Sequence, residues 1–136
     1  MPDDCIFCKI INGEIPSSKL YEDDLVYAFL DIQPVNRGHT LIIPKEHHKD
    51  LLETPEETID AMFRAVKKVA PAVIRGVNAD GFNLGMNNKE AAGQVVFHAH
   101  LHIVPRFKDD GLKLWPGGKY DEGEAERIKE SITKEL

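Results

Sequence analysis

The chain has no long apolar run and too little positive charge to bind nucleic acid through its overall field. No stretch reaches the roughly 18 apolar residues of a membrane-spanning helix, and Lys9 and Asn12 interrupt the apolar run that a secretory leader would need. Lysine and arginine total 17 against 23 aspartates and glutamates, a formal net charge of −6, which disfavours a nucleic-acid backbone as ligand. We therefore expect a cytoplasmic protein that binds neither nucleic acid nor a membrane.

Cysteine is equally scarce, with only Cys5 and Cys8 in 136 residues. A chain of this length and 42% hydrophobic residues can bury a core as a single domain over residues 1–136 without disulfides. In the cytoplasm the Cys-x-x-Cys pair would stay reduced and available for metal or redox chemistry. A thioredoxin-like role is disfavoured, because the pair does not follow a strand in a βαβ unit.

The pattern of turn formers and apolar residues predicts one long helix. Thr54 and Glu57 form a capping-box pattern with Pro55 at the first helical position. Apolar residues then recur at helical spacing from Ile59 to about residue 74, and Gly76 is suited to the C-cap.

Strand signals outnumber this helix. Residues rich in Val, Ile, Phe and Tyr predict strands over 20–30, 40–43, 82–86 and 95–104. An amphipathic stretch over 124–136 predicts a terminal helix packed on the surface. Because no strand–helix–strand alternation repeats, we expect an α+β fold: a mainly antiparallel sheet of about five strands, one long central helix and a C-terminal helix.

Half of the six histidines fall within five residues, at His98, His100 and His102. On a strand, alternate residues share one face, so three imidazoles would line up while Leu101 and Ile103 face the core. Imidazoles can divide nucleophilic attack, proton transfer and charge stabilisation, which suits attack on phosphorus to give a phosphoramidate intermediate. They also suit a metal ion that activates water. The spacing does not decide between these two chemistries.

The segment 98–104 resembles the histidine triad (HIT) signature, His-φ-His-φ-His-φ-φ, in which φ is apolar. Segments 5–11, 28–32, 38–47 and 93–98 are similar to further segments of that family, in the same order. The resemblance spans about residues 5–105, with residues 106–136 as a C-terminal extension. It is closest to the Hint-like branch, whose members are nucleotide-binding homodimers that hydrolyse nucleoside phosphoramidates and related adenylates. It implies a HIT-like fold, a purine nucleotide substrate and a homodimer.

The resemblance also implies roles for individual residues. His100 is the nucleophile that carries a covalent nucleotidyl intermediate, His102 and His39 support phosphate binding and proton transfer, and His98 completes the triad. Asp31 would accept hydrogen bonds from the ribose hydroxyls. The contacts to the phosphate and the leaving group would be made by Asn87, Gln94, Val95 and Val96. The apolar walls of the base pocket would be formed by Ile6, Phe7, Ile10, Phe29, Ile32 and Leu41.

Some members of the family bind a structural zinc, and the equivalent ligands here are Cys5, Cys8, His47 and His98. This set supplies the second pair that the Cys-x-x-Cys motif lacks. His48 is the alternative to His47. No organic cofactor is expected.

Four functions are compared. The phosphoramidase-like nucleotidyl hydrolase or transferase is preferred. The alternatives are a dinucleoside polyphosphate hydrolase, a zinc-dependent hydrolase that uses the triad as metal ligands, and a non-catalytic nucleotide-binding partner protein.

Overall fold

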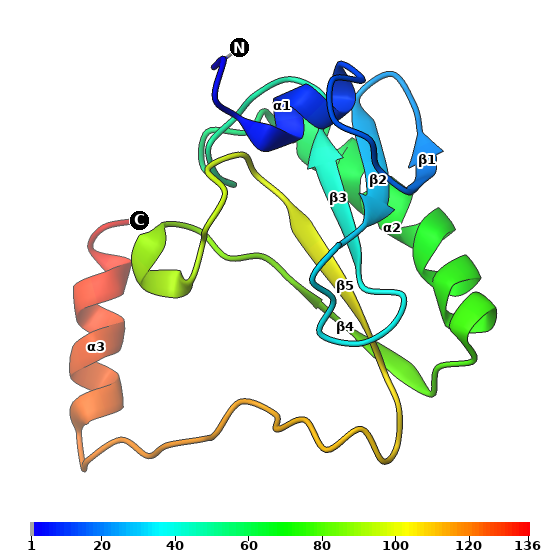
Figure 1. Ribbon diagram of the computed structural model, residues 1–136. Coiled ribbons are helices and arrows are strands. Elements are labelled where there is room, and N and C mark those ends of the chain that lie inside the picture. The colour runs from blue at the N-terminus through cyan, green and yellow to red at the C-terminus, as the bar shows by residue number, and fades with distance from the viewer. Residues whose placement is uncertain (1) are drawn as a thin grey trace.

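A five-stranded sheet with a long helix against one face forms the body of the molecule (Figure 1). The computed structural model describes residues 2–136. The strand order is β1-β2-β3-β5-β4, and every neighbouring pair is antiparallel. The strands are β1 (Lys19–Glu22), β2 (Val26–Leu30), β3 (Thr40–Pro44), β4 (Gly81–Gly85) and β5 (Leu101–Arg106). The helices are α1 (Ile6–Ile11), α2 (Glu56–Val77) and α3 (Glu124–Thr133), with a 3₁₀ turn η1 (Glu90–Ala92). The predicted α+β fold is confirmed.

The long helix α2 begins and ends later than its sequence pattern indicates. Pro55 is the N-cap rather than the first helical residue, and the Thr54 hydroxyl donates to the Asp50 carbonyl at 2.7 Å instead of capping the helix. At the other end Asn78 takes the left-handed conformation at φ 58° and replaces the predicted Gly76 as C-cap. Asparagine tolerates this conformation, so the last helical turn extends to Val77.

Two of the predicted strands are shorter than expected. Residues 20–30 form two strands because the Asp23 carboxylate accepts the N–H groups of Leu25 and Val26, each at 2.9 Å, and turns the chain. The strand predicted over 95–104 begins only at Leu101. Just before it, the Ala99 N–H donates to the His48 carbonyl at 2.7 Å rather than to a neighbouring strand. His98 therefore precedes the sheet.

The two faces of the sheet are covered differently. Leu101 and Ile103 join the core between the sheet and α2, as predicted. On the opposite face, Phe7 and Cys8 of α1 pack with Leu41 in a second buried cluster. Burial alternates along β5, so its histidine faces this second cluster and not α2.

The C-terminal helix forms but does not pack as predicted. Figure 1 places α3 away from the sheet, at the end of an extended segment. Within residues 2–136, α3 contains no buried residue, and Ile132 on its apolar stripe is 57% exposed. None of the helices in that range is long and apolar enough to cross a membrane.

Candidate active site around His100 and His102

A pocket of about 430 Å³ opens on the sheet face that carries His102. All six residues predicted as base-pocket walls line it: Ile6, Phe7, Ile10, Phe29, Ile32 and Leu41. The pocket also contains Asp31, Asn87, Val95, Val96, His100 and His102. The structure therefore brings most of the predicted substrate residues together around one cavity.

Five other lining residues were missed by sequence reasoning: Ile15, Pro16, Ser17, Leu30 and Gln33. Their side chains carry no distinctive chemistry. The only available signal was their position beside α1 and at the end of β2.

His100 presents an unused ring nitrogen. Its Nδ1 lies 2.7 Å from the His98 carbonyl oxygen and therefore carries the hydrogen that it donates. Burial lowers the pKa of His100, so the ring is neutral at pH 7 and the Nε2 lone pair is free. The Phe7 ring packs edge-on against it, with centroids 5.1 Å apart. Such a nitrogen can act as a nucleophile.

His39 and His102 form a hydrogen-bonded pair whose tautomers follow from a main-chain group. The Val35 N–H donates to Nδ1 of His39 at 3.0 Å, so the hydrogen of His39 is on Nε2. That Nε2 lies 2.9 Å from Nδ1 of His102 and donates to it. Burial lowers the pKa of His102 to about 4 and also lowers that of His39.

The neutral His102 ring therefore carries its hydrogen on Nε2. This atom is buried and has no hydrogen-bond partner in residues 2–136. A buried N–H without a partner costs free energy. At the edge of the pocket it is suited to donate to an anionic ligand.

Asp31 stands at the opposite end of the same loop from His39. Its Oδ1 accepts the Gln33 N–H at 2.8 Å, as in a turn cap. Its Oδ2 lies 3.7 Å from His39 Nε2, too far for a hydrogen bond. The carboxylate therefore keeps an oxygen for a hydroxyl group of a ligand.

Gln94 does not line the pocket, in contrast to its predicted phosphate contact. It is 3% exposed, and its Nε2 donates to the carbonyls of Lys49 at 2.6 Å and Val96 at 3.1 Å. Its Oε1 accepts the Lys89 N–H at 2.8 Å. Main-chain groups already bond to both the oxygen and the nitrogen of this amide, so Gln94 holds the shape of the loop over residues 87–96 in this structure.

Lys89 in this loop has a backbone conformation that is almost exclusive to glycine, with φ 74° and ψ 160°. Its ammonium donates to the buried Asp50 carboxylate at 2.9 Å. That hydrogen bond is the main cause that lowers the pKa of Asp50. The ion pair and the Gln94 contact hold the strained residue in place.

We expect Lys89→Gly to melt about 3–6 °C above Lys89→Ala. Both variants lose the ion pair to Asp50, but only glycine relieves the backbone strain. At an ordinary exposed position the order would be reversed, because glycine loses more chain entropy on folding than alanine. Thermal unfolding followed by circular dichroism measures the difference, and an alanine variant that melts higher would show that Lys89 is unstrained.

His98 lies outside the pocket, in a separate cluster of cysteines and histidines. Its Nε2 donates to the Pro44 carbonyl at 2.8 Å, which leaves the Nδ1 lone pair free. Nδ1 lies 3.4 Å from Cys5 Sγ, 3.6 Å from Cys8 Sγ and 3.1 Å from His47 Nδ1. The three triad histidines thus do not form one row: His98 faces this cluster and supports His100 through its carbonyl.

The geometry of this cluster fits a tetrahedral zinc ion. The four ligand atoms of Cys5, Cys8, His47 and His98 all lie within 4.8 Å of one another. Zinc bonds of ~2.3 Å to sulfur and ~2.0–2.1 Å to nitrogen place tetrahedral ligands about 3.3–3.8 Å apart. Burial raises the pKa of the Cys8 thiol to about 11, so a thiolate at neutral pH needs a cation beside it. His48 is outside the cluster, and its Nε2 lies 3.8 Å from Glu46.

Comparison with known proteins gives matches along most of the chain. The model of the HIT domain family matches residues 12–109. Adenylylsulfatase HINT3 of Arabidopsis thaliana is 49% identical over 112 residues, which cover 82% of this chain but only 57% of that relative. Adenosine 5'-monophosphoramidase HNT1 of Candida albicans is 40% identical, over 97% of this chain and 91% of its own.

Solved structures agree with these sequence matches. A HIT family protein from Bacillus subtilis has 45% identity and a TM-score of 0.89 over 98% of each chain. A zinc-bound histidine triad family protein from Mycobacterium smegmatis has 38% identity and a TM-score of 0.77, over 94% of this chain and 97% of its own.

Proposed function

Because this chain belongs to the HIT domain family, we propose that it is a nucleotide hydrolase or transferase that cleaves nucleoside 5'-phosphoramidates or related adenylates through a covalent intermediate on His100. The observation that carries this proposal is the His100 tautomer. The hydrogen bond from Nδ1 to the His98 carbonyl leaves the Nε2 lone pair unused in a ring that lines the pocket. Two similar proteins have names that describe cleavage of adenylyl sulfate and of an adenosine phosphoramidate.

The residues that line the pocket support one arrangement of the substrate. The purine base packs in the apolar slot of α1 and β2 beside Phe7 and Phe29, and the ribose hydroxyls donate to Asp31. The α-phosphate then lies between the imidazoles of His100 and His102. Asn87, Val95 and Val96 line the same cavity, and the Asn87 amide and the main-chain N–H groups of the two valines would supply neutral donors.

The reaction proceeds in two displacement steps. His100 Nε2 uses its lone pair to form a bond to phosphorus while the bond to the leaving amine breaks, and the amine takes its proton from solvent. A water oxygen then attacks the same phosphorus, the bond to His100 returns its electron pair to Nε2, and the water proton goes to solvent. In both steps the His102 Nε2–H donates to a phosphate oxygen and stabilises its negative charge.

The hydrogen bonds around the pocket weigh against a zinc-dependent hydrolase. Asp31, His39 and His102 bring ligand-type atoms within 4.8 Å of one another. However, Nδ1 of His39 accepts the Val35 N–H, so its Nε2 carries a hydrogen and has no lone pair for a metal. These ring nitrogens therefore suit the hydrogen-bonded pair of His39 and His102 better than they suit a catalytic metal ion.

We propose a structural zinc instead, held by Cys5, Cys8, His47 and His98, with no organic cofactor. Its four-ligand set leaves no open position for water, which is typical of structural sites. Bound there, zinc ties the start of α1 to the segment that precedes β5.

We expect turnover of adenosine 5'-phosphoramidate to persist when a chelator is added, at a temperature at which circular dichroism shows that the fold is intact. The reason is that the attacking atom is a ring nitrogen and not a metal-bound water. A steady-state assay with and without chelator, on this substrate and on a diadenosine polyphosphate, is the measurement. Loss of turnover in the folded, chelated protein would favour the zinc hydrolase. Nucleotide binding without any turnover would favour the non-catalytic partner, and a higher kcat/KM for the polyphosphate would favour that substrate class.

We also propose that the protein is a homodimer. β4 is an edge strand of the sheet and exposes Phe82 and Leu84, and unprotected edges of this kind are commonly covered by a partner. Light scattering at micromolar concentration tests this, and a monomer mass would contradict it.

A further inference from the structure

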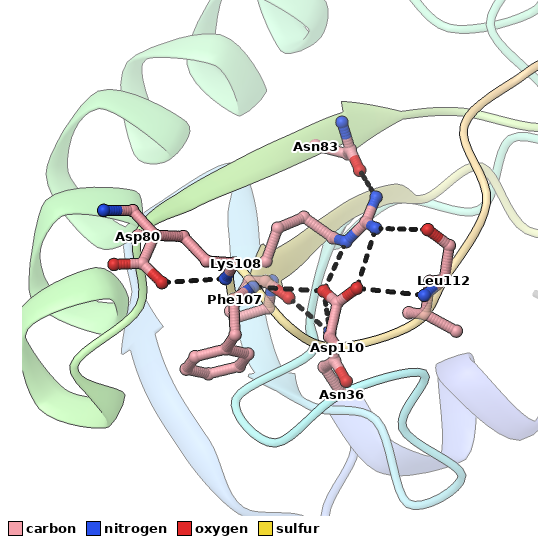
Figure 2. Close-up of polar contacts among 9 residues, drawn as sticks. Asn36, Asp80, Asn83, Phe107, Lys108, Asp110 and Leu112 are labelled. Atoms are coloured by element: carbon pink, nitrogen blue, oxygen red, sulfur yellow. Dashed lines mark hydrogen bonds and ion pairs between the residues drawn. The ribbon is translucent and has the colours of Figure 1, made fainter.

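The side chain of Asn36 ties the loop between Asp31 and His39 to the end of β5 by hydrogen bonds. The Asn36 Nδ2 group donates to the Pro105 carbonyl at 2.9 Å and to Asp110 Oδ2 at 3.1 Å. These contacts join segments 69 and 74 positions apart in the chain (Figure 2). Asn36 therefore helps to fix where this loop lies relative to β5, the strand that carries His102.

Asp110 is a rigid anchor for Asn36. Its carboxylate accepts hydrogen bonds from the Arg106 guanidinium at 2.8 and 3.0 Å. It also accepts the main-chain N–H groups of Phe107 and Leu112, each at 3.0 Å (Figure 2). The Arg106 contact is the main reason that the pKa of Asp110 is held well below its usual range. Because these donors hold the pKa low, the carboxylate stays charged, and with a side chain that is only 8% exposed it is also held in place.

From Asn36 the hydrogen bonds continue to His39. The Asn36 carbonyl accepts the His39 N–H at 3.1 Å, and the Val35 N–H next to it donates to His39 Nδ1 at 3.0 Å. The loop therefore forms hydrogen bonds with both the main chain and the ring of His39. Of these two contacts, only the one between the Val35 N–H and His39 Nδ1 determines which ring nitrogen carries the hydrogen.

The Val35 N–H determines whether the His102 nitrogen that faces the pocket carries a hydrogen or a lone pair. With this donor in place, His39 carries its hydrogen on Nε2 and His102 carries its own on Nε2, as a donor. Without it, His39 can hold its hydrogen on Nδ1 and accept at Nε2, and the hydrogen of His102 then moves to Nδ1. His102 would in that case present a lone pair to the phosphate, which repels an anion.

We propose that Asn36, held by Asp110, is a positioning residue that keeps the Val35 N–H on His39 and thereby keeps the hydrogen of His102 on Nε2. The kinetic part of its test rests on the proposed function, whereas the tautomer of His102 can be measured whether or not the protein turns over nucleotides.

The loop has other attachments that keep it folded when Asn36 is changed. Arg37 stacks on the Phe107 ring at 4.0 Å from its centroid. Gly38, at φ 87°, packs so closely on Val77 that an added Cβ would lie 2.9 Å from the valine side chain. Arg37 is therefore a matched control, because it anchors the same loop but makes no contact in the chain from Asn36 to His102.

The experiment compares wild type, Asn36→Ala and Arg37→Ala by long-range ¹H–¹⁵N correlation NMR of ¹⁵N-histidine-labelled protein, together with kcat and KM for adenosine 5'-phosphoramidate. We expect the wild type and Arg37→Ala to show the Nε2–H tautomer of His102. Asn36→Ala is expected to show a mixture of tautomers, with kcat lower by about 10-fold and KM changed by less than about 2-fold. Asp110→Asn weakens the anchor without removing it and should shift the tautomers in the same direction.

Two results overturn the proposal. One is a pure Nε2–H tautomer of His102 in folded Asn36→Ala and Asp110→Asn, whatever happens to kcat. The other is an equal tautomer shift in Arg37→Ala, which would show a general loosening of the loop. If Asn36→Ala does not fold, Asp110→Asn against Arg37→Ala gives the same decision. Absent turnover in the wild type would contradict the proposed function while the NMR comparison still tests the positioning role.

Discussion

Replacement of His100 by alanine or glycine is expected to lower kcat for adenosine 5'-phosphoramidate by a factor on the order of 10⁴ or more, with nucleotide affinity changed by only about threefold. In the proposed mechanism the ring supplies the attacking atom, while most of the surface proposed to bind the nucleotide comes from the apolar walls of α1 and β2. The effect should therefore fall on kcat. His48→Asn is a matched control, because it removes an imidazole that lies outside the pocket lining.

The covalent intermediate can be captured directly. Rapid-quench labelling of the wild type with substrate that carries a radioactive α-phosphate should give a nucleotidyl-protein that is labile in acid and stable in base, as phosphoramidates are. The His100 variants should carry no label. A variant that keeps a kcat close to that of the wild type would refute the covalent mechanism, and a label that survives acid would place the group on a different type of side chain.

The second large effect is expected from removal of the zinc ligands. Cys5→Ser and Cys8→Ser should each reduce the bound zinc from about one ion per chain to a small fraction of that. They should also lower the melting temperature by about 10 °C or more, because metal bound only by the folded protein adds its binding free energy to the stability. Addition of a chelator to the wild type should reproduce the loss of stability. The effect on kcat at low temperature should be much smaller, since no step of the proposed reaction uses the metal.

Metal analysis of protein purified without added zinc, combined with thermal unfolding, is the measurement. His48→Asn is again the control and should keep its zinc, because the structure places His47 and not His48 beside the cysteines. Substoichiometric zinc that neither cysteine substitution changes would leave Cys5 and Cys8 as two ordinary buried thiols.

Much of the candidate site was predictable because its signals are local. Apolar spacing predicted α2, and the strands predicted over 20–30 and 40–43 end and begin next to Asp31 and His39. The residues of segments 5–11, 28–32 and 38–47 that were expected around a base do line one pocket. The helix and strand ends were less predictable. The capping-box pattern at Thr54 failed because the hydroxyl bonds to the Asp50 carbonyl, a contact that propensity does not encode.

The sequence by itself determined which side chains are available: three closely spaced histidines, a Cys-x-x-Cys pair, and the apolar periodicity of helix and strands. Only the tertiary structure decided how they are used. It placed Gln94 in hydrogen bonds that hold its loop, and it placed His98 in the cysteine cluster rather than in the predicted row of histidines. It also fixed which ring nitrogens of the remaining histidines carry a hydrogen. The physical reason is that these outcomes depend on main-chain partners such as the Pro44 carbonyl and the Val35 N–H. Almost every residue carries one main-chain N–H and one carbonyl, so the pattern of side chains does not show which of these groups will contact a given ring. Only the folded path of the chain brings a particular N–H or carbonyl to a particular imidazole.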